Sequence, residues 1–507
     1  MNIPFVGPTY AGRSSNIDAS RSVNFYPETN PGGAKSVIAL VNTPGTVLWT
    51  QAGPSPVRGM HVFAGQLYVV AGGKLYSVDA RGVVSGSLGT LATSAGRVAI
   101  ADNGVAASGV GGNQLMIVDG GSGYIHNAAT GAFVTISGGG WPASGASTLT
   151  YIDGYFVVGN ANSMSVSASN LYDGTVWSAL ATSPVSAAPD LVQAVINVHQ
   201  QLWVIKEYTS EVWYDAGTPT SQGFPFNRIS GAVVDYGTPA PASVARGDNS
   251  FFFLANQRNN DGGEFAGVVE LSGIIPQIVT PPAVTYRMSR YPTVGDAFAY
   301  CYSSEGHTFY VITFPAGNAT WVYDAATQMW HERSTWTEQA LSGDRLAVPA
   351  ANGAGTAPQS FGRHVGNCYA GYADMHLVGD WQNGNIYEMR SDVYQDNGLP
   401  LVSMRTSQHV FDKKGMENIF IRRLVLDMET GVGDGAAQQG GMEPQAGLAW
   451  SDDGGHTWSN EYWASMGAAG RYRTRVIWRR LGWSRDRIFR VSISDPVKRV
   501  LIGADAI

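Results

Sequence analysis

Short apolar runs of about four residues recur along the chain, and a second, more mixed run follows each of them after a turn. In the first unit the apolar run Leu67–Val70 precedes the mixed run Leu75–Asp79. The mixed run contains the aromatic residue Tyr76 and ends in the polar residue Asp79. Continuous apolar runs of this length are typical of strands buried on both faces, whereas alternating runs are typical of more exposed strands. The pattern therefore predicts pairs of neighbouring strands, one buried and one exposed.

The unit recurs, which indicates a repeat architecture. Successive units begin 48, 40, 47, 49, 58 and 67 residues apart, at Leu67, Leu115, Tyr155, Leu202, Phe251, Phe309 and His376. Four-stranded propeller blades take about 40–50 residues, and loop insertions lengthen the interval. We predict an all-β chain with a β-propeller over residues 51–398, in which each apolar run is an inner blade strand. Seven blade-like units are counted, and six blades remain possible if one unit is a separate hairpin; a β-sandwich is the alternative architecture.

The two ends of the chain have different patterns. Residues 1–50 are rich in Pro, Gly, Asn and Ser and predict an extended N-terminal arm, with one closing strand at Val37–Leu40. Beyond residue 398 the runs become longer and alternate, as in Phe420–Leu426 and Ile488–Ile493. Alternation of this kind predicts antiparallel strands with one buried face. Residues 399–507 are therefore expected to form a separate, antiparallel β-sandwich-like domain.

Composition supports many short strands and adds a charge asymmetry. Only 14% of the residues are charged, while there are 63 Gly, 14 Trp and 23 Tyr. The net charge of −7 argues against a general nucleic-acid binder. From Leu401 onward there are 15 Lys or Arg and 12 Asp or Glu, which leaves 17 basic and 27 acidic residues before it. The first part thus carries −10 and the last part +3, which suggests two faces with different neighbours.

Motifs for catalysis, cofactors and metals are not found in the sequence. It contains no H-E-x-x-H, no G-x-x-x-x-G-K-[ST] and no G-x-S-x-G. Its two cysteines, Cys301 and Cys368, stand far apart, so neither a disulfide framework nor a Cys-based zinc site is expected. We also expect no signal peptide and no membrane-spanning segment, and hence synthesis in the cytoplasm. The prediction is a protein that is not an enzyme and needs no cofactor.

One local motif is distinctive. The stretch from Ser451 to Trp458 follows the S-x-D-x-G-x-T-W pattern of the Asp box, which is familiar from sialidases and related propellers; the matching residues are Ser451, Asp453, Gly455, Thr457 and Trp458. Ser and Asp side chains can accept hydrogen bonds from backbone amides in a turn, and Gly permits positive φ. We interpret the motif as a stabilised hairpin, and glycan cleavage is the competing interpretation.

A basic segment follows the Asp box. Over residues 471–499 ten Lys or Arg residues accompany two Asp residues. Arg471, Arg473 and Arg475 are spaced by two, which predicts one face of a strand, and Arg479 and Arg480 follow them. Three interpretations remain open for these five arginines: they line a DNA path through phosphate contacts, they form a subunit interface with acidic side chains, or they are a solvated strand face.

Longer strings resemble a known family. The chain is similar to the packaged-DNA stabilisation proteins of podophages, also described as tail nozzle or tail hub proteins. The resemblance extends through nearly the whole chain and rests on the Asp box and on Ser22–Glu28, Asp153–Phe156, Glu211–Tyr214, Glu305–Tyr310, Trp330–Arg333 and Ser492–Val497.

The resemblance implies a structural protein of the phage virion tail. It implies a ring of copies, a homo-hexamer in the well-known relatives, attached below the portal and its adaptor ring. Such a head-to-tail connector continues the channel for double-stranded DNA, offers sites to tail needle, fibre or spike proteins, and retains packaged DNA until ejection. No catalytic residues are carried over. The alternative is a glycan-binding or sialidase-like propeller that acts in receptor recognition, for which the Asp box is the main support.

Overall fold

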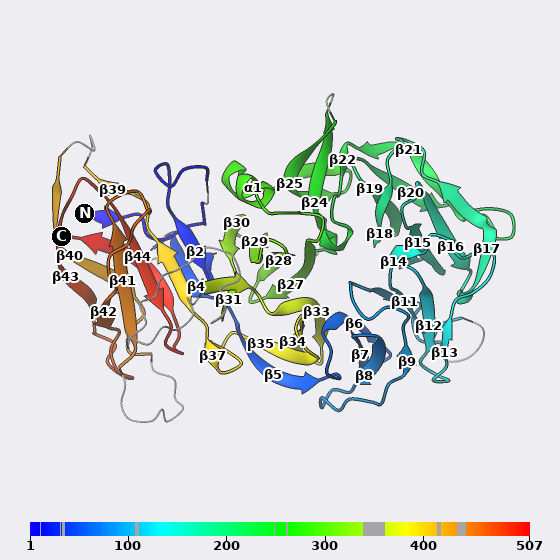
Figure 1. Ribbon diagram of the computed structural model, residues 1–507, viewed down its shortest axis with the longest axis horizontal. Helices are drawn as coiled ribbons and strands as arrows, with labels where there is room; N and C mark the ends of the chain where they lie inside the picture. Colours follow the sequence, from blue (N-terminus) through cyan, green and yellow to red (C-terminus); the bar gives the residue numbers. More distant parts are fainter. Residues whose placement is uncertain are drawn as a thin grey trace.

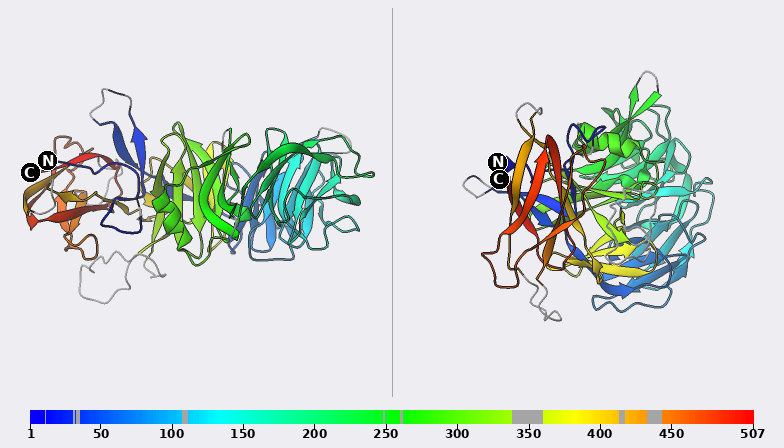
Figure 2. Two further views of the ribbon diagram at one scale, coloured as in Figure 1. Left: turned by 90° about the horizontal axis from the view of Figure 1, so that it is seen from above. Right: turned by 60° about the vertical axis from the view of Figure 1, so that its left-hand side comes forward.

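A computed structural model describes residues 1–507 except 11, 31, 33–35, 107–110, 248, 260–261, 338–359, 413–416 and 433–442. The described residues form two β modules that lie end to end along the longest axis of the molecule (Figures 1 and 2). One module is a ring of sheets and the other a two-sheet sandwich. Within this described part, the regular helices are α1 (Pro282–Ser289) and one short 3₁₀ turn (Pro241–Ser243).

The ring is a propeller, and seven sheets form its blades among the described residues (Figure 1). In chain order, the first four blades consist of β6 Val57–Phe63, β7 Gln66–Ala71, β8 Lys74–Val78 and β9 Gly89–Thr90; β10 Ala99–Asp102, β11 Gln114–Val118, β12 Gly123–Asn127 and β13 Phe133–Thr135; β14 Ala146–Ile152, β15 Tyr155–Asn160, β16 Ser165–Asn170 and β17 Asp173–Pro184; and β18 Val192–Val198, β19 Gln201–Lys206, β20 Ser210–Asp215 and β21 Phe226–Val234.

The remaining blades are more elaborate. They consist of β22 Tyr236–Gly237, β23 Ala245–Arg246, β24 Phe251–Asn259, β25 Gly262–Ser272 and β26 Ile275–Ile278; β27 Phe298–Ser304, β28 His307–Phe314, β29 Ala319–Asp324 and β30 Met329–Glu332; and β33 Gly366–Tyr372, β34 Met375–Asp380, β35 Asn385–Arg390 and β5 Gly45–Gln51, which β36 Gln395–Asp396 and β37 Leu399–Pro400 extend. A separate hairpin joins β31 Ser334–Thr337 to β32 Ser360–Arg363.

Each apolar run, predicted as an inner blade strand, is the second strand of its blade. The first strands, such as β6 and β14, precede the apolar runs and are mostly buried, with two more exposed positions each. The second strands are buried on both faces because neighbouring blades cover them: Val157 of β15 and Val204 of β19 share one apolar cluster between adjacent blades. Full burial of such a side chain contributes about 1.5–3 kcal/mol.

The polar residue that ends many units makes a turn. The Asp79 carboxylate accepts hydrogen bonds from the N–H groups of Arg81 and Val83, each at 2.9 Å. Asp324 accepts one from the N–H of Ala326 at 3.0 Å. Aspartate bonded to backbone two residues ahead stabilises a turn locally, so the recurring acid marks where the third strand of a blade ends.

The prediction of an extended arm at residues 1–50 was wrong, because the described part of this segment contributes strands that pair into the sheets of both modules. Residues 45–51 form β5, the fourth strand of the seventh blade, where Met389 pairs with Thr46. The start of the chain thus closes the ring against strands that lie more than 300 residues later. The strand predicted at Val37–Leu40 exists as β4 (Ile38–Asn42), but it belongs to the sandwich and does not close the propeller.

The sandwich is built from both ends of the chain. Its first sheet has the order β3 (Phe25–Thr29), β4, β45 (Val500–Ala506), β40 (Ile419–Met428) and β43 (Val476–Ser484), and β1 (Asn2–Ile3) pairs with β45. Its second sheet has the order β2 (Arg21–Val23), β38 (Ser403–Thr406), β44 (Asp486–Ile493), β41 (Gln445–Ser451) and β42 (Tyr462–Ser465), and β39 (Val410–Phe411) pairs with β44.

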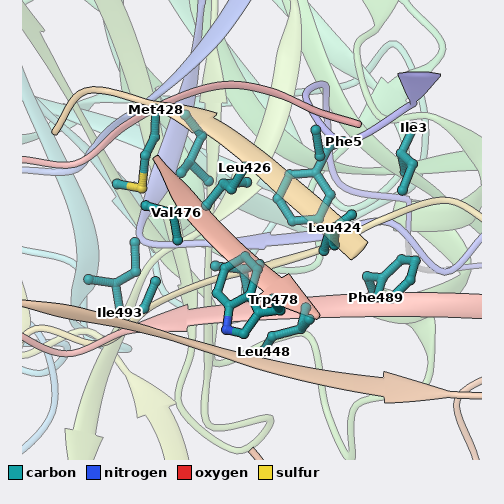
Figure 3. Close-up of a cluster of buried hydrophobic side chains, with 14 of the residues drawn as sticks. Ile3, Phe5, Leu424, Leu426, Met428, Leu448, Val476, Trp478, Phe489 and Ile493 are labelled. Carbon is teal, nitrogen blue, oxygen red and sulfur yellow. The ribbon is translucent and has the colours of Figure 1, made fainter. Parts of the chain in front are cut away.

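Side chains from the two sheets meet in one core (Figure 3). Leu424 and Leu426 of β40 and Trp478 of β43 face Leu448 and Phe489 of the opposite sheet. Ile3 and Phe5 from the N-terminal segment complete this core. Deleting the N-terminal segment would therefore remove part of the core of the C-terminal module.

The two modules share a continuous sheet. Strand β30 of the sixth blade pairs with β2 through Val23 and Glu332. Arg21 donates two hydrogen bonds of 2.7 Å to the Glu332 carboxylate across this junction. The Asn24 side chain donates to the backbone carbonyls of Ser334 and Val402 at 2.9 and 2.8 Å. These bonds tie the sandwich to the propeller at buried and partly buried positions.

Candidate interaction surfaces on the sandwich

The Asp box is the hairpin turn between β41 and β42. Ser451 Oγ accepts a hydrogen bond from the N–H of Gly455 at 2.8 Å and donates one to Asp453 Oδ1 at 2.7 Å. Asp453 also accepts from the N–H groups of His456 and Thr457 at 3.0 and 2.9 Å and from the Thr457 hydroxyl at 2.5 Å. The hydrogen bond from the Thr457 hydroxyl is the largest cause that lowers the pKa of Asp453 well below its usual range, and the bond from the Thr457 N–H is the second. The Asp453 carboxylate therefore stabilises the turn by accepting hydrogen bonds within it.

The glycines of the Asp box also let another segment approach. Gly454 has φ +74°, and a Cβ at this position would lie 2.1 Å from the Asn16 side chain. The N-terminal loop that contains Asn16 thus packs directly on the turn. His409 holds the same loop, since its Nε2 lies 2.6 Å from the carbonyl oxygen of Ser15. The Asp box is a joint between the sandwich and the N-terminal segment.

The residues beside the motif form a second layer under the turn. Asp452 accepts two hydrogen bonds from the buried guanidinium of Arg487 at 2.6 and 2.8 Å. Arg487 also donates to the carbonyl oxygens of Leu481 and Trp483. The half-buried Trp458 ring lies under the guanidinium of Arg490, 4.2 Å from its centroid. Bidentate and cation–π contacts of this kind fix a turn in one geometry.

The basic segment separates into buried and exposed arginines. Arg487 and Arg499 are buried, and Arg499 donates to the carbonyl oxygen of Leu401 and the hydroxyl of Ser403, each at 2.7 Å. Such arginines hold the fold together by satisfying backbone acceptors. The five candidate arginines named from the sequence are exposed instead.

Arg471, Arg473 and Arg475 do not lie on a strand, so the prediction from their spacing was wrong. They occupy a turn and the link that precedes β43, and the N–H of Thr474 donates to the carbonyl of Arg471 at 3.1 Å. Gly470, with φ +86°, starts this turn. Arg471 pairs with Glu443 at 3.1 Å, with the Arg471 side chain 71% exposed and the Glu443 side chain 37% exposed. An exposed pair of this kind contributes about 0–1 kcal/mol.

Arg479 and Arg480 lie on β43, and the structure brings two further arginines beside them. Arg422 and Arg423 of the neighbouring strand β40 line the same open depression of about 580 Å³, together with Phe420, Gly482 and Ile507. Strands β40 and β43 lie at the end of the molecule away from the propeller (Figure 1). We call Arg422, Arg423, Arg479 and Arg480 the arginine face. The sequence interpretation missed Arg422 and Arg423, although their adjacency in an alternating strand was a visible signal.

A cavity of about 600 Å³ lies between the last blade and the sandwich. Its carboxylates are Asp380, Asp396 and Glu461, and no Lys or Arg is among its described lining residues. Asp380 accepts from the N–H of Gln382 at 2.7 Å and from the Tyr387 hydroxyl at 3.0 Å. Burial raises the pKa of Asp396 to about 6. The cavity lacks the cationic group that would bind an acidic sugar.

Metal-ligand clusters and membrane-spanning helices are not found in the part of the chain that the structure describes. Across the described residues, no group of three or more His, Cys, Asp or Glu side chains is arranged to hold a metal ion. None of the helices in that same part of the chain is long and apolar enough to cross a membrane.

Comparisons with solved structures find remote similarities. The WD40 domain of Pan2 from Neurospora crassa has 9% identity and a TM-score of 0.39, with 69% of this chain and 96% of that chain covered. U3-55K has 8% identity and a TM-score of 0.39, with 68% and 99% covered. No curated protein matches the chain.

Family models account for both modules. The model described as "Bacteriophage P22 Gp10, beta-propeller" matches residues 1–394, and the model described as "Bacteriophage P22 Gp10, beta-sandwich" matches residues 405–506. The first match covers the propeller and the second covers most of the sandwich. The N-terminal strands β1 to β4 lie within the first match but belong to the sandwich. The chain therefore belongs to the family of bacteriophage P22 Gp10, a family of phage structural proteins that stabilise packaged DNA.

Proposed function

We propose that this chain is the subunit of a tail nozzle, or hub, in the virion tail. Copies of it form a ring, a homo-hexamer, below the portal and its adaptor ring. The ring continues the channel for double-stranded DNA, retains packaged DNA until ejection, and offers outer surfaces to needle, fibre or spike proteins. The role is mechanical and needs no catalytic turnover.

The observation that carries this proposal is the family match to both modules over almost the whole chain. The junction supports it, because a mechanical part requires its modules to move together. Arg21, Glu332 and Asn24 tie the sandwich to the sixth blade through buried or half-buried hydrogen bonds. The charge distribution also agrees, since the first 400 residues carry 17 basic and 27 acidic groups, and an acidic channel wall would let DNA slide during ejection without binding its phosphates.

The direct test is a stop codon at Trp49 in the phage gene, with the wild-type chain supplied from a plasmid as the control. We expect heads that package DNA and then lose it, measured as nuclease-sensitive genomes in purified particles. The plasmid copy should restore nuclease protection. Heads that stay full but fail to adsorb to cells would contradict the nozzle role and favour receptor recognition.

The alternative function, a glycan-binding or sialidase-like propeller, has the Asp box as its support. The contacts of Asp453 occupy its carboxylate in the turn, and the junction cavity offers no cation for a sialic acid carboxylate. We expect no turnover of a fluorogenic sialoside by the purified chain. Robust hydrolysis that survives repeated purification would contradict a purely mechanical role.

A further inference from the structure

The arginine face gathers like charges without compensation. Arg423 of β40 and Arg479 of β43 are direct cross-strand partners. Like charges in this relation destabilise a sheet. Among the described residues, none of the four arginines has a carboxylate within ion-pair distance, and Arg423 Nε is buried without a hydrogen-bond partner. The described side chains supply no ion pair to this cluster, so its positive charge is available to an anionic partner.

A bulge in β43 directs an additional arginine into the cluster. Ile421 pairs with Gly482 and Arg423 pairs with Arg479, so two residues of β43 oppose one residue of β40. Arg480 takes φ +62°, which is strained for a side chain of this size. Without the extra residue, alternation would turn Arg480 into the core; instead Arg479 and Arg480 are both exposed. Bulges that re-aim side chains are frequent at functional positions.

Exposed aromatic residues flank the arginine face and favour a protein partner. Phe420 is 49% exposed and Trp483 is 65% exposed, and their ring centroids lie 4.8 Å apart. Aromatic residues and arginine are enriched at the centres of protein interfaces. Duplex phosphates need basic groups but no exposed aromatic rings. The composition of the surface therefore indicates an acidic protein surface as the partner.

An acidic groove lies at the opposite edge of the same sheet. Strand β3 forms that edge, whereas β43 forms the other. A groove of about 540 Å³ separates β3 from the propeller and contains the carboxylates of Glu28, Glu305, Asp392 and Glu429. Glu429 pairs with Lys498 at 2.9 Å and Asp392 pairs with Arg390 at 2.6 Å.

Two carboxylates of this groove stay uncompensated. Glu28 and Glu305 have no ion-pair partner among the described residues. Burial raises the pKa of Tyr26 most, and the negative charges of Glu305 and Glu28 raise it further. Tyr26 lines the same groove as these two carboxylates. We call Glu28 and Glu305, with the groove around them, the acidic groove.

We propose that the arginine face of one copy docks on the acidic groove of a second copy of this chain. The contact joins two different surfaces, so it is head-to-tail and generates a ring when the rotation closes. This inference rests on the proposed ring and names the surfaces that join its subunits. Opposite charges at the two edges of one sheet determine which surfaces meet, and Phe420 and Trp483 supply apolar area beside the arginines.

Charge reversal tests the contact. One variant carries Arg422→Glu and Arg479→Glu, and a second carries Glu28→Arg and Glu305→Arg. Each variant alone should associate at least about tenfold more weakly than the wild type in sedimentation equilibrium. An equimolar mixture should assemble again, because every contact in an alternating ring then joins opposite charges. A chain with all four changes should also assemble alone.

The matched control carries Arg473→Glu and Arg475→Glu, which change the charge equally on exposed positions of the same module. Circular dichroism and melting temperature identify any variant that fails to fold. Association lost equally in the control, or not restored in the mixture, would overturn the proposed contact. Reversal of the arginine face that leaves assembly intact but weakens binding to a duplex DNA fragment would also overturn it and assign the face to DNA.

Particles distinguish this failure from failure of the nozzle role. If Arg422→Glu/Arg479→Glu particles assemble rings and keep their DNA while the stop codon at Trp49 empties the heads, the nozzle role stands and the proposed contact is wrong. If the stop codon leaves the heads full, the proposed function fails independently of the contact.

Discussion

The propeller and the sandwich contain the same kind of strand but are assembled in opposite ways. The first six blades use strands that follow one another in the chain, from β6 to β30. The sandwich joins strands from residues 2–42 to strands from residues 403–506, and Met1 donates a hydrogen bond to the carbonyl of Ala506 at 2.7 Å. One module is local and repetitive, whereas the other depends on the meeting of the two ends of the chain.

The difference teaches where the molecule is most vulnerable. A blade buries its second strand between two neighbours, so damage to one blade leaves most others intact. The sandwich has one core that requires both chain ends at once. Non-local contacts must overcome a larger loop-closure entropy before they form. Changes near residue 1 should therefore act on the C-terminal module, and the following predictions test that expectation.

The largest effect is expected from a chain that begins at Thr43. This deletion removes β1 to β4 with Phe5, Phe25 and Leu40 from the sandwich core, while β5 remains to close the propeller. Limited proteolysis followed by mass spectrometry should show rapid cleavage after residue 403 and a protected propeller fragment. A sandwich that remains protected would contradict its dependence on the N-terminal strands.

A single core residue should give a smaller effect with the same direction. Phe25→Ala in β3 and Phe156→Ala in β15 each remove a fully buried ring and should each cost about 3–5 kcal/mol. Phe25→Ala should expose the C-terminal segment in hydrogen exchange, whereas Phe156→Ala should expose the third blade and its neighbours. Identical exchange patterns in the two variants would contradict the separation into two cores.

The junction between the modules should respond to pH through Asp396. Burial raises its pKa to about 6, and the Arg333 charge opposes this shift. The unfolded carboxyl titrates near pH 4, so the folded state binds the proton more tightly and stability falls as pH rises from about 4 to 6. Asp396→Asn keeps an acceptor for the Thr46 hydroxyl and removes the ionisation. Relative to wild type, it should gain about 3 kcal/mol between pH 4 and pH 8 in urea unfolding, and a constant difference would contradict this.

A smaller effect is expected at the layer under the Asp box. Asp452→Ala leaves the buried Arg487 guanidinium without its carboxylate and should cost about 1–3 kcal/mol in thermal unfolding. The double variant Asp452→Ala/Arg487→Met should recover part of this loss, because no charge is then left unpaired. A double variant less stable than Asp452→Ala would show that the backbone bonds of Arg487 matter more than its ion pair.

Local sequence determined the parts of the fold whose interactions span few residues. The repeat spacing indicated the propeller, because a blade is a run of hairpins and its second strand is apolar on both faces. The Asp box indicated its own turn, because Ser451, Asp453 and Thr457 bond to one another within six residues. The sequence also showed the charge asymmetry between residues 1–400 and residues 401–507, because counting charged residues requires no knowledge of contacts.

Only the tertiary structure decided which distant segments meet. Residues 1–50 suggested an arm because nothing local reveals that β5 completes a blade beside β35 or that β3 and β4 join β45. The spacing of Arg471, Arg473 and Arg475 suggested a strand. Backbone hydrogen bonds of a turn that begins at Gly470 instead place these arginines before strand β43. The arginine face depends on the register between β40 and β43 and on the bulge at Arg480, and core packing sets that register. Such pairing is a property of the folded sheet, so the sequence alone leaves it open.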